Sequence, residues 1–249
     1  MVLLQKKSPS PDQSLEIVFR QMDFWYQTIL GSHLLKTELD ELDRCLPKFF
    51  GRHLLQVGGP SEVLLFEKSP ILYRTRLTPE YSSVFKGPTI QAELQALPLL
   101  SESIDVILLP HVLEFYAQAR GLLQQLYTAL IPGGHLLVLG FNPFSLWGIK
   151  KCCSHQKTLP WRGNFHSAAK IRHWLSSAGF VIEAQRDLFY RPPLNHPRAL
   201  KKSLLLEPMG RLLWPSCGGS YLIIAKKSVS AWIAVDKPAS QKISVATGT

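Results

Sequence analysis

The sequence predicts an α/β fold with a doubly wound, mostly parallel sheet. Residues 104–142 carry this prediction, because an apolar run at 105–109 is followed by a helical pattern and by a second apolar run at 136–139. In the helical part, apolar residues recur three and four positions apart and mark one buried face. Pro132-Gly133-Gly134 ends the helix, since proline lacks an amide hydrogen and glycine tolerates positive φ. A strand, a helix and a strand in this order form a parallel crossover with both strand faces buried.

The same residues predict where a ligand binds. In open sheets of this kind, ligands bind beyond the carboxyl ends of the strands. The two strands of the crossover end at Pro110-His111 and at Phe141-Asn142. We therefore expect these residues to lie at a binding site.

The other strands are short apolar runs between turn residues. We predict a seven-stranded sheet with strands at 53–57, 71–76, 89–92, 104–109, 135–141, 180–187 and 220–226. A helix over 167–178 ends at Gly179. Residues 188–219 are rich in proline and predict a long connection with at most a short helix.

Two more helices are predicted near the N-terminus. The first covers residues 15–29, with Asp12 or Ser14 as its cap and Gly31 as its stop. The second is capped by Thr37 and ended by Pro47. Its acids, at positions 38, 40 and 41, suit the positive end of a helix dipole.

The chain length of 249 residues suits one α/β domain with an extension. We predict a flexible segment and a helical extension over residues 1–50, the main domain over 51–227, and a tail over 228–249. The tail is rich in Ser, Lys, Ala and Thr, and no internal repeat is visible.

The charge is distributed unevenly. Residues 1–149 hold 12 Lys and Arg against 14 Asp and Glu, whereas residues 150–249 hold 16 against 4. The net charge of +10 is therefore −2 in the first part and +12 in the second. Such a field attracts nucleic acid, anionic lipid or a small acidic substrate, although dispersed Lys and Arg also simply keep a protein in solution.

The compartment is predicted from the cysteines and from the apolar runs. The four cysteines, at positions 45, 152, 153 and 217, lack the spacing of a disulfide framework, which indicates a reducing compartment. The N-terminus does not have the order of a secretory signal. No run approaches the roughly 18 apolar residues of a membrane span. We therefore expect a cytoplasmic protein without a membrane span.

Several short segments carry a resemblance to a known family. They are the crossover with its Pro-Gly-Gly turn, PHVLEF at 110–115, GFNPFSLWG at 140–148, FYRPP at 189–193 and GGSYLIIAKK at 218–227. Together they resemble the class I S-adenosylmethionine-dependent methyltransferases, in particular the methyltransferase type 11 domain and a bacterial YafS-like subgroup, over roughly residues 25–227. The resemblance implies a Rossmann-like sheet with an antiparallel last strand, and S-adenosyl-L-methionine as the cofactor.

The family's glycine motif implies the first cofactor-binding residues. In the family, an acid, an apolar residue and three alternating glycines follow the first strand, so that the backbone can approach the methionine part of the cofactor. Here Gln56 stands in place of the acid, and Gly58 and Gly59 allow the close approach, whereas Pro60 and Glu62 replace the later glycines. An amide can still hydrogen-bond the cofactor's ammonium group, but it supplies no full charge.

The second and third strands differ in how well they match the family. The family's acid after the second strand binds both ribose hydroxyls, but residues 73–76 read Tyr-Arg-Thr-Arg, and Glu80 comes later. This departure is compatible with weak cofactor binding, a modified cofactor or a loss of catalysis. Glu93 matches the family's acid before Leu-Pro, so it is expected to accept from the adenine amino group while Leu94 contacts the ring. The alternative for Glu93 is a solvated glutamate after an edge strand.

His111 is the candidate catalytic residue. A base is needed only when the attacking atom of the acceptor must lose a proton. His111 directly follows Pro110, which is expected to contact the cofactor, and the ordinary histidine pKa near ~6.5 suits proton transfer. The alternatives are that His111 caps the following helix or packs against the cofactor. Glu114, one turn on, is a candidate to orient the ring.

The acceptor is predicted to bind after the fifth strand. Asn142 and Trp147 are expected to line its pocket, and Arg191 to attract an anionic group. Core packing is the alternative for the tryptophan. Cys152 and Cys153 are adjacent and lack the paired spacing of a zinc site, so no metal is expected.

The sequence therefore predicts an S-adenosylmethionine-dependent methyltransferase with a small-molecule or acidic acceptor. A nicotinamide enzyme is not favoured, because the Gly-x-Gly-x-x-Gly motif and the acid about 20 residues beyond it are absent. The alternative is a non-catalytic binding or regulatory module that retains this fold. Either form is compatible with RNA binding through the basic C-terminal part.

Overall fold

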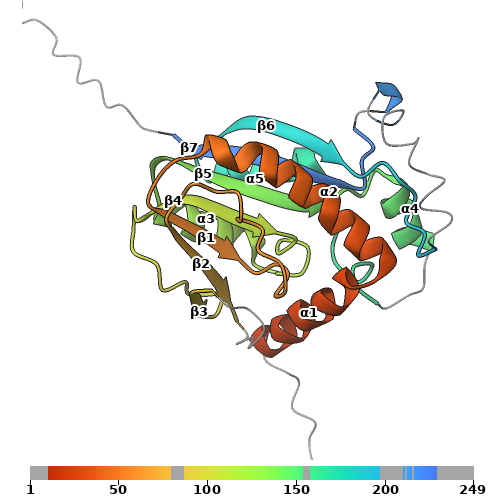
Figure 1. The fold of residues 1–249 in the computed structure, drawn as a ribbon, viewed down its shortest axis with the longest axis horizontal. Coiled ribbons are helices and arrows are strands. Elements are labelled where there is room, and N and C mark those ends of the chain that lie inside the picture. Colours follow the sequence, from red (N-terminus) through yellow and green to blue (C-terminus); the bar gives the residue numbers. More distant parts are fainter. Residues whose placement is uncertain are drawn as a thin grey trace, which may run out of the picture.

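A computed structural model describes residues 11–79, 87–153, 158–196, 210, 212–214 and 216–228 of the chain (Figure 1). The helices are α1 (Pro11–Tyr26), α2 (Ile29–Cys45), a 3-10 turn at Leu46–Lys48, α3 (Ala119–Ala129), α4 (Leu146–Cys153) and α5 (Ala168–Ser177). The strands are β1 (His53–Val57), β2 (Tyr73–Thr78), β3 (Thr89–Gln91), β4 (Ile104–Pro110), β5 (Leu130–Phe141), β6 (Phe180–Leu188) and β7 (Ser220–Lys227).

The seven strands form one sheet in the order β3-β2-β1-β4-β5-β7-β6. β7 runs antiparallel to both of its neighbours, and the pairs from β3 to β5 are all parallel. The predicted Rossmann-like, doubly wound sheet with an antiparallel last strand is therefore confirmed. The order reverses between β1 and β4, and such a reversal is where open α/β sheets bind ligands.

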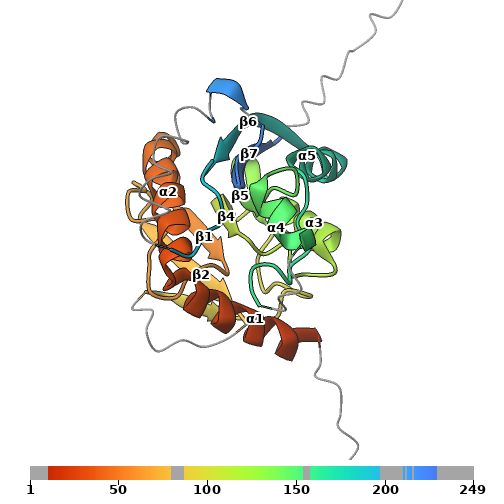
Figure 2. The same cartoon turned by 90° about the vertical axis from the view of Figure 1, so that its right-hand side faces the viewer.

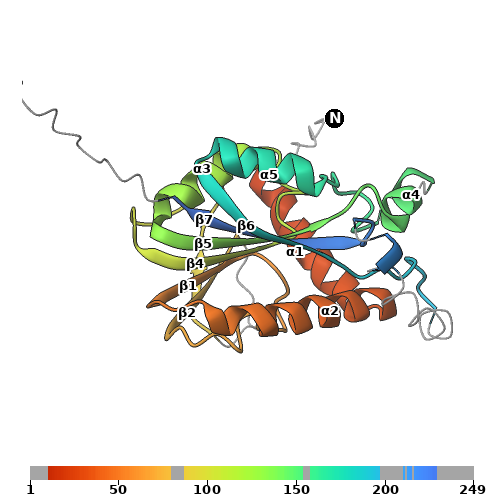
Figure 3. The same cartoon turned by 90° about the horizontal axis from the view of Figure 1, so that it is seen from above.

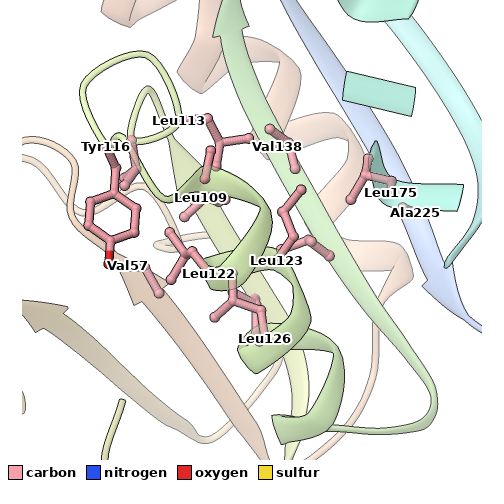
Figure 4. Close-up of a cluster of buried hydrophobic side chains, with 14 of the residues drawn as sticks. Val57, Leu109, Leu113, Tyr116, Leu122, Leu123, Leu126, Val138, Leu175 and Ala225 are labelled. Carbon is pink, nitrogen blue, oxygen red and sulfur yellow. The ribbon is translucent and has the colours of Figure 1, made fainter. Parts of the chain in front are cut away.

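One face of the sheet is covered by α3 and α5. Leu122, Leu123 and Leu126 of α3 and Leu175 of α5 are buried against the strands. Figure 4 shows these side chains converging with Val138 of β5. The three-and-four spacing of the α3 leucines produces this face, as the periodicity predicted.

The opposite face is covered by α2, which comes from the N-terminal extension. Leu34 and Leu42 of α2 pack against Leu54 of β1 and Val106 of β4 in one buried cluster. The connection between β1 and β2, residues 58–72, is described throughout and contains no helix. Figure 3 shows α2 alone along this face, with α3 and α5 on the other.

α1 crosses the edge of the sheet where the parallel strands end. Its residues Leu15 and Phe19 belong to the cluster on the α3 side, whereas Met22, Trp25 and Tyr26 belong to the cluster on the α2 side. Figure 2 shows α1 passing across the ends of β1 and β2, between the two helical layers. α1 therefore lies at the edge where a ligand is expected.

Both predicted N-terminal helix boundaries were wrong. α2 begins at Ile29, because Thr28 caps it by accepting a hydrogen bond from the Gly31 amide at 3.1 Å. Gly31 therefore lies inside α2 instead of ending α1. Thr37 also lies inside α2, where its hydroxyl donates to the His33 carbonyl at 3.1 Å. A cap and a helix interior are chemically compatible with the same hydroxyl, so the side-chain type alone does not distinguish them.

The later elements match the predictions within a few residues. β1 has the predicted bounds, and Ser167 caps α5 by accepting from the Lys170 amide at 3.2 Å. β5 begins at Leu130, before the Pro-Gly-Gly turn, because Leu130 pairs with Ile104 and the register then shifts. α4 was not predicted. The predicted tail falls largely outside the described residues, and the division at residues 50 and 227 stays a prediction.

Among the described helices, none has the length and apolarity that crossing a membrane requires.

Candidate functional site

The loop after β1 makes a tight turn at the point of strand reversal. Gly58 and Gly59 have φ angles of +70° and +83°, a region that favours glycine. A Cβ on Gly58 would lie 2.7 Å from the Phe19 ring, and one on Gly59 would lie 2.6 Å from Pro110. The Gly58 amide donates to the Leu77 carbonyl of β2 at 2.8 Å. Both glycines are therefore needed to bring this loop between β2, β4 and α1.

Gln56 is completely buried at the end of β1. Its amide nitrogen donates to the Gly58 carbonyl at 2.8 Å, and its Oε1 atom has no hydrogen-bond partner in the structure. A buried acceptor without a partner is uncommon and costs free energy, so it needs an explanation. This oxygen is therefore a candidate acceptor for a ligand donor.

Arg76 lies beside Gln56, because the two residues pair in the register of β1 and β2. The Arg76 side chain is 2% exposed, and its Nη2 atom donates to the Gly59 carbonyl at 2.8 Å. A cation therefore stands near the end of β2, where the resemblance leads one to expect an acid. Glu80, the possible substitute, lies outside the described residues.

α1 supplies a carboxylate to the same loop. Asp23 accepts hydrogen bonds from the Ser61 amide at 2.7 Å and from the Ser61 hydroxyl at 2.5 Å. Burial raises the pKa of Asp23 from 3.8, while the Ser61 hydrogen bonds and the field of Arg76 act in the opposite direction. One helical turn on, Gln27 donates to Glu62 at 3.0 Å. The sequence reading missed Asp23, because its position in α1 carries no motif.

The side chains of Glu93 and Leu94, which follow β3, differ in their exposure. Leu94 is completely buried in the cluster with α3, whereas the Glu93 side chain is exposed. Gln125 of α3 fixes this loop by accepting from the Leu97 amide at 2.9 Å and donating to the Leu94 carbonyl at 3.3 Å. The predicted contacts of Glu93 and Leu94 with a cofactor stay predictions.

His111 is held between two buried carboxylates at the end of β4. Its Nε2 atom lies 2.9 Å from Glu38 of α2, and its Nδ1 atom lies 3.3 Å from Glu114. All three side chains are almost fully buried. The backbone of His111 has a φ of +51°, an uncommon conformation for a residue other than glycine. Strain of this kind persists only where the surroundings determine it, and it gathers at functional sites.

The protonation of His111 follows from these contacts. Burial, the largest single influence, lowers its pKa, but the charge of Glu38 and the hydrogen bonds to both carboxylates raise it from 6.5 to about 10. At neutral pH the ring is therefore an imidazolium that donates from both nitrogens. His111 could act as a base only if its contacts with Glu38 and Glu114 changed. Its catalytic role therefore stays a prediction.

Glu114 connects His111 to β5. Its Oε1 atom also accepts from the Phe141 amide at 2.8 Å, and its Oε2 atom is buried without a hydrogen-bond partner. The expected contact of Glu114 with the His111 ring is present. Glu38 was missed as a site residue, because its place near the start of a predicted helix suggested a dipole interaction. Only the packing of α2 against the end of β4 brings it to His111.

The three predicted acceptor residues have structural contacts. Asn142 is 4% exposed; its side chain donates to the Ser216 carbonyl at 3.0 Å and accepts from the Phe144 amide at 3.0 Å. Trp147 is completely buried, and its Nε1 atom donates to the Arg191 carbonyl at 3.1 Å. The Arg191 guanidinium lies over the Phe189 ring at 5.6 Å. Their predicted role in acceptor binding stays a prediction.

An apolar pocket of about 570 Å³ lies beside these residues. Its lining residues come from the turn after β5, from α4 and from the segment before β7: Pro143, Phe144, Ser145, Leu146, Ile149, Tyr190, Gly210, Trp214 and Cys217. Several of the aromatic and aliphatic side chains in this lining are more than half exposed. An exposed apolar hollow of this kind is typical of a small-molecule site.

In the part of the chain that the structure describes, no group of three or more His, Cys, Asp and Glu side chains is placed to hold a metal ion. Cys152 and Cys153 are both exposed and free. His155 lies outside the described residues.

Comparisons with known proteins agree with this architecture. Residues 57–138 match the family model of a methyltransferase domain. The chain is 29% identical over 210 residues to the uncharacterized protein YafS of Escherichia coli, covering 82% of this chain and 80% of that protein.

Solved structures share the fold at low sequence identity. A Thermotoga maritima S-adenosylmethionine-dependent methyltransferase, described as a possible histamine N-methyltransferase, has a TM-score of 0.63 and 17% identity, covering 88% of this chain and 100% of that one. The N-methyltransferase NodS of Bradyrhizobium japonicum, in complex with S-adenosyl-L-homocysteine, has a TM-score of 0.56 and 13% identity, covering 88% and 99%.

The strand order and the antiparallel β7 give the chain the fold of these methyltransferase structures, and the segment that matches the methyltransferase-domain model lies within that sheet. The chain is also similar to YafS, as the short segments from PHVLEF to GGSYLIIAKK predicted.

Proposed function

We propose that this chain is an S-adenosylmethionine-dependent methyltransferase acting on a small-molecule or acidic acceptor. One observation supports the proposal most directly: at the point of strand reversal, the Gly58-Gly59 turn adjoins the buried, unpartnered Oε1 atom of Gln56. An amide oxygen there is an acceptor for the ammonium group of a bound amino acid. The matched methyltransferase domain and the fold of the solved relatives point in the same direction.

The residues fit the amino-acid end of the cofactor better than its ribose end. Gln56, Gly58, Gly59 and Pro110 would hold the methionine part. Arg76 stands near the end of β2, where the family's acid would hold the ribose.

The exposed Glu93 would lie at the edge of the adenine ring, while the buried Leu94 anchors this loop against α3. When bound, the cofactor supplies a methyl group already activated by the sulfonium, and the protein mainly aligns the acceptor with it.

In this proposal, His111 lies at the catalytic position and acts as a cation that orients its neighbours. Because the imidazolium keeps its proton, it holds Glu38 and Glu114 in place at the end of β4. The Oε2 atom of Glu114 is then the acceptor available for a proton of the methyl acceptor.

The acceptor itself is assigned to the edge after β5. Asn142 fixes the turn that forms one wall of the apolar pocket, and Trp147 forms the packed floor behind that turn. Arg191 adds positive charge nearby. An acceptor with an apolar body and an anionic group matches this environment.

Calorimetric titration of S-adenosylmethionine and S-adenosylhomocysteine into the full chain tests the proposal. We expect binding at micromolar concentration, weakened in the Glu93→Ala variant. Because Glu93 is exposed, this variant should retain its fold, and circular dichroism checks that point. No binding at millimolar ligand would contradict the proposal.

The second candidate is a binding or regulatory module that kept the fold and lost turnover. The charge of Arg76 and the packing of Phe19 on Gly58 favour it, because both side chains lie where the cofactor would enter. A chain that binds the cofactor but transfers no labelled methyl to any fraction of a bacterial extract would support this candidate.

RNA binding by the basic C-terminal part is compatible with either candidate. It predicts retention of RNA that falls steeply with salt, because the released counterions set the affinity. A filter-binding series at increasing salt measures it, and retention that does not change with salt would contradict it.

A further inference from the structure

The end of β1 has an unusual electrostatic balance. The residues beneath the glycine turn are the neutral amide of Gln56 and the cation of Arg76. Neither can neutralise a positively charged ligand group, and the arginine repels it. An ammonium group is strongly hydrated, so it leaves water only at a large cost unless a charged partner replaces the lost hydration. A cationic ligand end would therefore need a carboxylate from elsewhere in the chain.

One carboxylate beside the glycine turn that can meet this need comes from α1. Both oxygens of Asp23 accept hydrogen bonds from Ser61, two residues after Gly59. Asp23 is partly buried, and the field of Arg76 reaches it. Glu62, the next acid in the loop, is exposed and accepts a hydrogen bond from Gln27.

α1 is held firmly enough to position Asp23. Met22 is 5% exposed and Tyr26 is 5% exposed, so the turns on either side of Asp23 are anchored in the core. Ser61, its partner, is 7% exposed. The carboxylate is therefore placed by packing on both sides, as a specific binding group must be.

We propose that Asp23 determines specificity for the amino-acid end of the cofactor, by supplying from α1 the carboxylate that β1 lacks. The inference rests on the proposed function. The carboxylate accepts from the ligand's α-ammonium together with Gln56 Oε1, while Ser61 keeps it oriented. The N-terminal extension is then part of the cofactor site, beyond its role as a cover for the sheet.

Two ligands separate this role from a structural one. S-adenosylhomocysteine carries the amino-acid group, whereas methylthioadenosine has the same adenosine and a thioether but lacks it. We expect Asp23→Asn to weaken the binding of S-adenosylhomocysteine by about 10- to 100-fold, the usual range for a hydrogen bond to a charged group. Binding of methylthioadenosine should change by less than about twofold.

Two further variants serve as controls. Asp40→Asn removes an equal charge from an exposed position on α2 and should change neither affinity. Ser61→Ala removes one of the two hydrogen bonds that orient Asp23 but leaves the carboxylate, so it should weaken S-adenosylhomocysteine binding by less than about tenfold and methylthioadenosine binding by less than about twofold. This second variant keeps the test decisive if Asp23→Asn folds poorly.

The outcomes are distinguishable. If Asp23→Asn leaves S-adenosylhomocysteine binding intact, or weakens both ligands equally, the inference is overturned while the proposed function stands. Equal weakening of the two ligands in Ser61→Ala, or no change in either, would also overturn it, because Ser61 and Asp23 would then act only on the loop or not at all. If the wild type binds neither ligand, the proposed function itself fails, and this inference with it.

Discussion

The two faces of the sheet are built from different chemistry. The face under α3 and α5 is almost entirely aliphatic and aromatic, and Leu122, Leu123 and Leu126 form its centre. The face under α2 includes buried charge: Glu38 lies 1% exposed against His111, and Glu41 lies 4% exposed against Arg186. Apolar contacts accept many arrangements of comparable free energy, whereas buried charges accept few.

The difference between the two faces indicates how the buried charges position α2 on the sheet. No helix lies between β1 and β2, so the N-terminal extension covers this face instead. α2 is distant from the sheet in sequence and could slide along a purely apolar surface. The pair Glu38–His111 ties the middle of α2 to the end of β4 and sets its register. We infer that buried charge gives this face its specificity, while the opposite face gives more of the stability.

The largest expected effect comes from breaking that tie. Glu38→Ala would leave the His111 imidazolium buried with one carboxylate, and we expect the free energy of unfolding to fall by about 4 kcal/mol. Urea unfolding of the variant measures it. Asp40→Ala, an exposed acid on the same helix, should change stability by less than about 0.5 kcal/mol. If Glu38→Ala and Asp40→Ala lowered the free energy of unfolding equally, the net charge of α2 would determine its stability, and the Glu38–His111 contact would not.

A cavity on the apolar face is the next test. Leu123 is completely buried, so Leu123→Ala should cost about 3 kcal/mol through lost burial and the cavity that remains. The cluster that holds Leu123 consists of apolar side chains and tyrosines, so we expect this cost to be the same at pH 6.5 and at pH 9.5. A cost that depends on pH would contradict the division between the faces.

The charged face should depend on pH, in a direction that the pKa of His111 sets. The folded pKa, about 10, lies above the ordinary value of 6.5. The stabilisation is therefore complete below pH about 6.5 and is lost as the pH rises towards 10. In urea unfolding, the wild type should lose more stability over this range than His111→Gln does. Parallel pH profiles for the two proteins would show that the imidazolium contributes nothing.

The smallest effect is expected at the rim of the charged face. Arg186 is half exposed, and Glu41 has a second partner in Arg44 at 2.9 Å. Arg186→Ala should therefore lower the free energy of unfolding by about 1 kcal/mol or less. Thermal unfolding at low and at high salt checks it, since salt should reduce the difference. A loss as large as that of Glu38→Ala would mean that solvent screens this pair poorly.

Most of the sheet could be predicted from the sequence, because each strand is a short apolar run bounded by turn residues. The bounds of β1 and the Ser167 cap of α5 depend on neighbouring residues alone. The glycine turn and the place of His111 after β4 were predicted for the same reason. The start of α2 was missed, because Thr28 and Thr37 are equally plausible caps until packing selects one.

The partners of the site residues could not be predicted in this way. Glu38 reaches His111 across 73 positions in the sequence, and Asp23 reaches Ser61 across 38. Nothing in the local pattern of α1 or α2 separates these acids from solvated ones. Trp147 is buried beside the apolar pocket, and because an aromatic side chain suits both a core and a pocket wall, its role in acceptor binding stays a prediction.

The sequence by itself determined the fold class, the strand-reversal edge and the identity of the residues placed on it, because periodicity and turn chemistry act over a few neighbours. Only the tertiary structure decided which helix covers the face left open between β1 and β2. It also decided which carboxylates meet His111 and Ser61, and so the charge of the site. Those outcomes depend on contacts between distant segments, where burial and Coulombic attraction act together and local propensity has no influence.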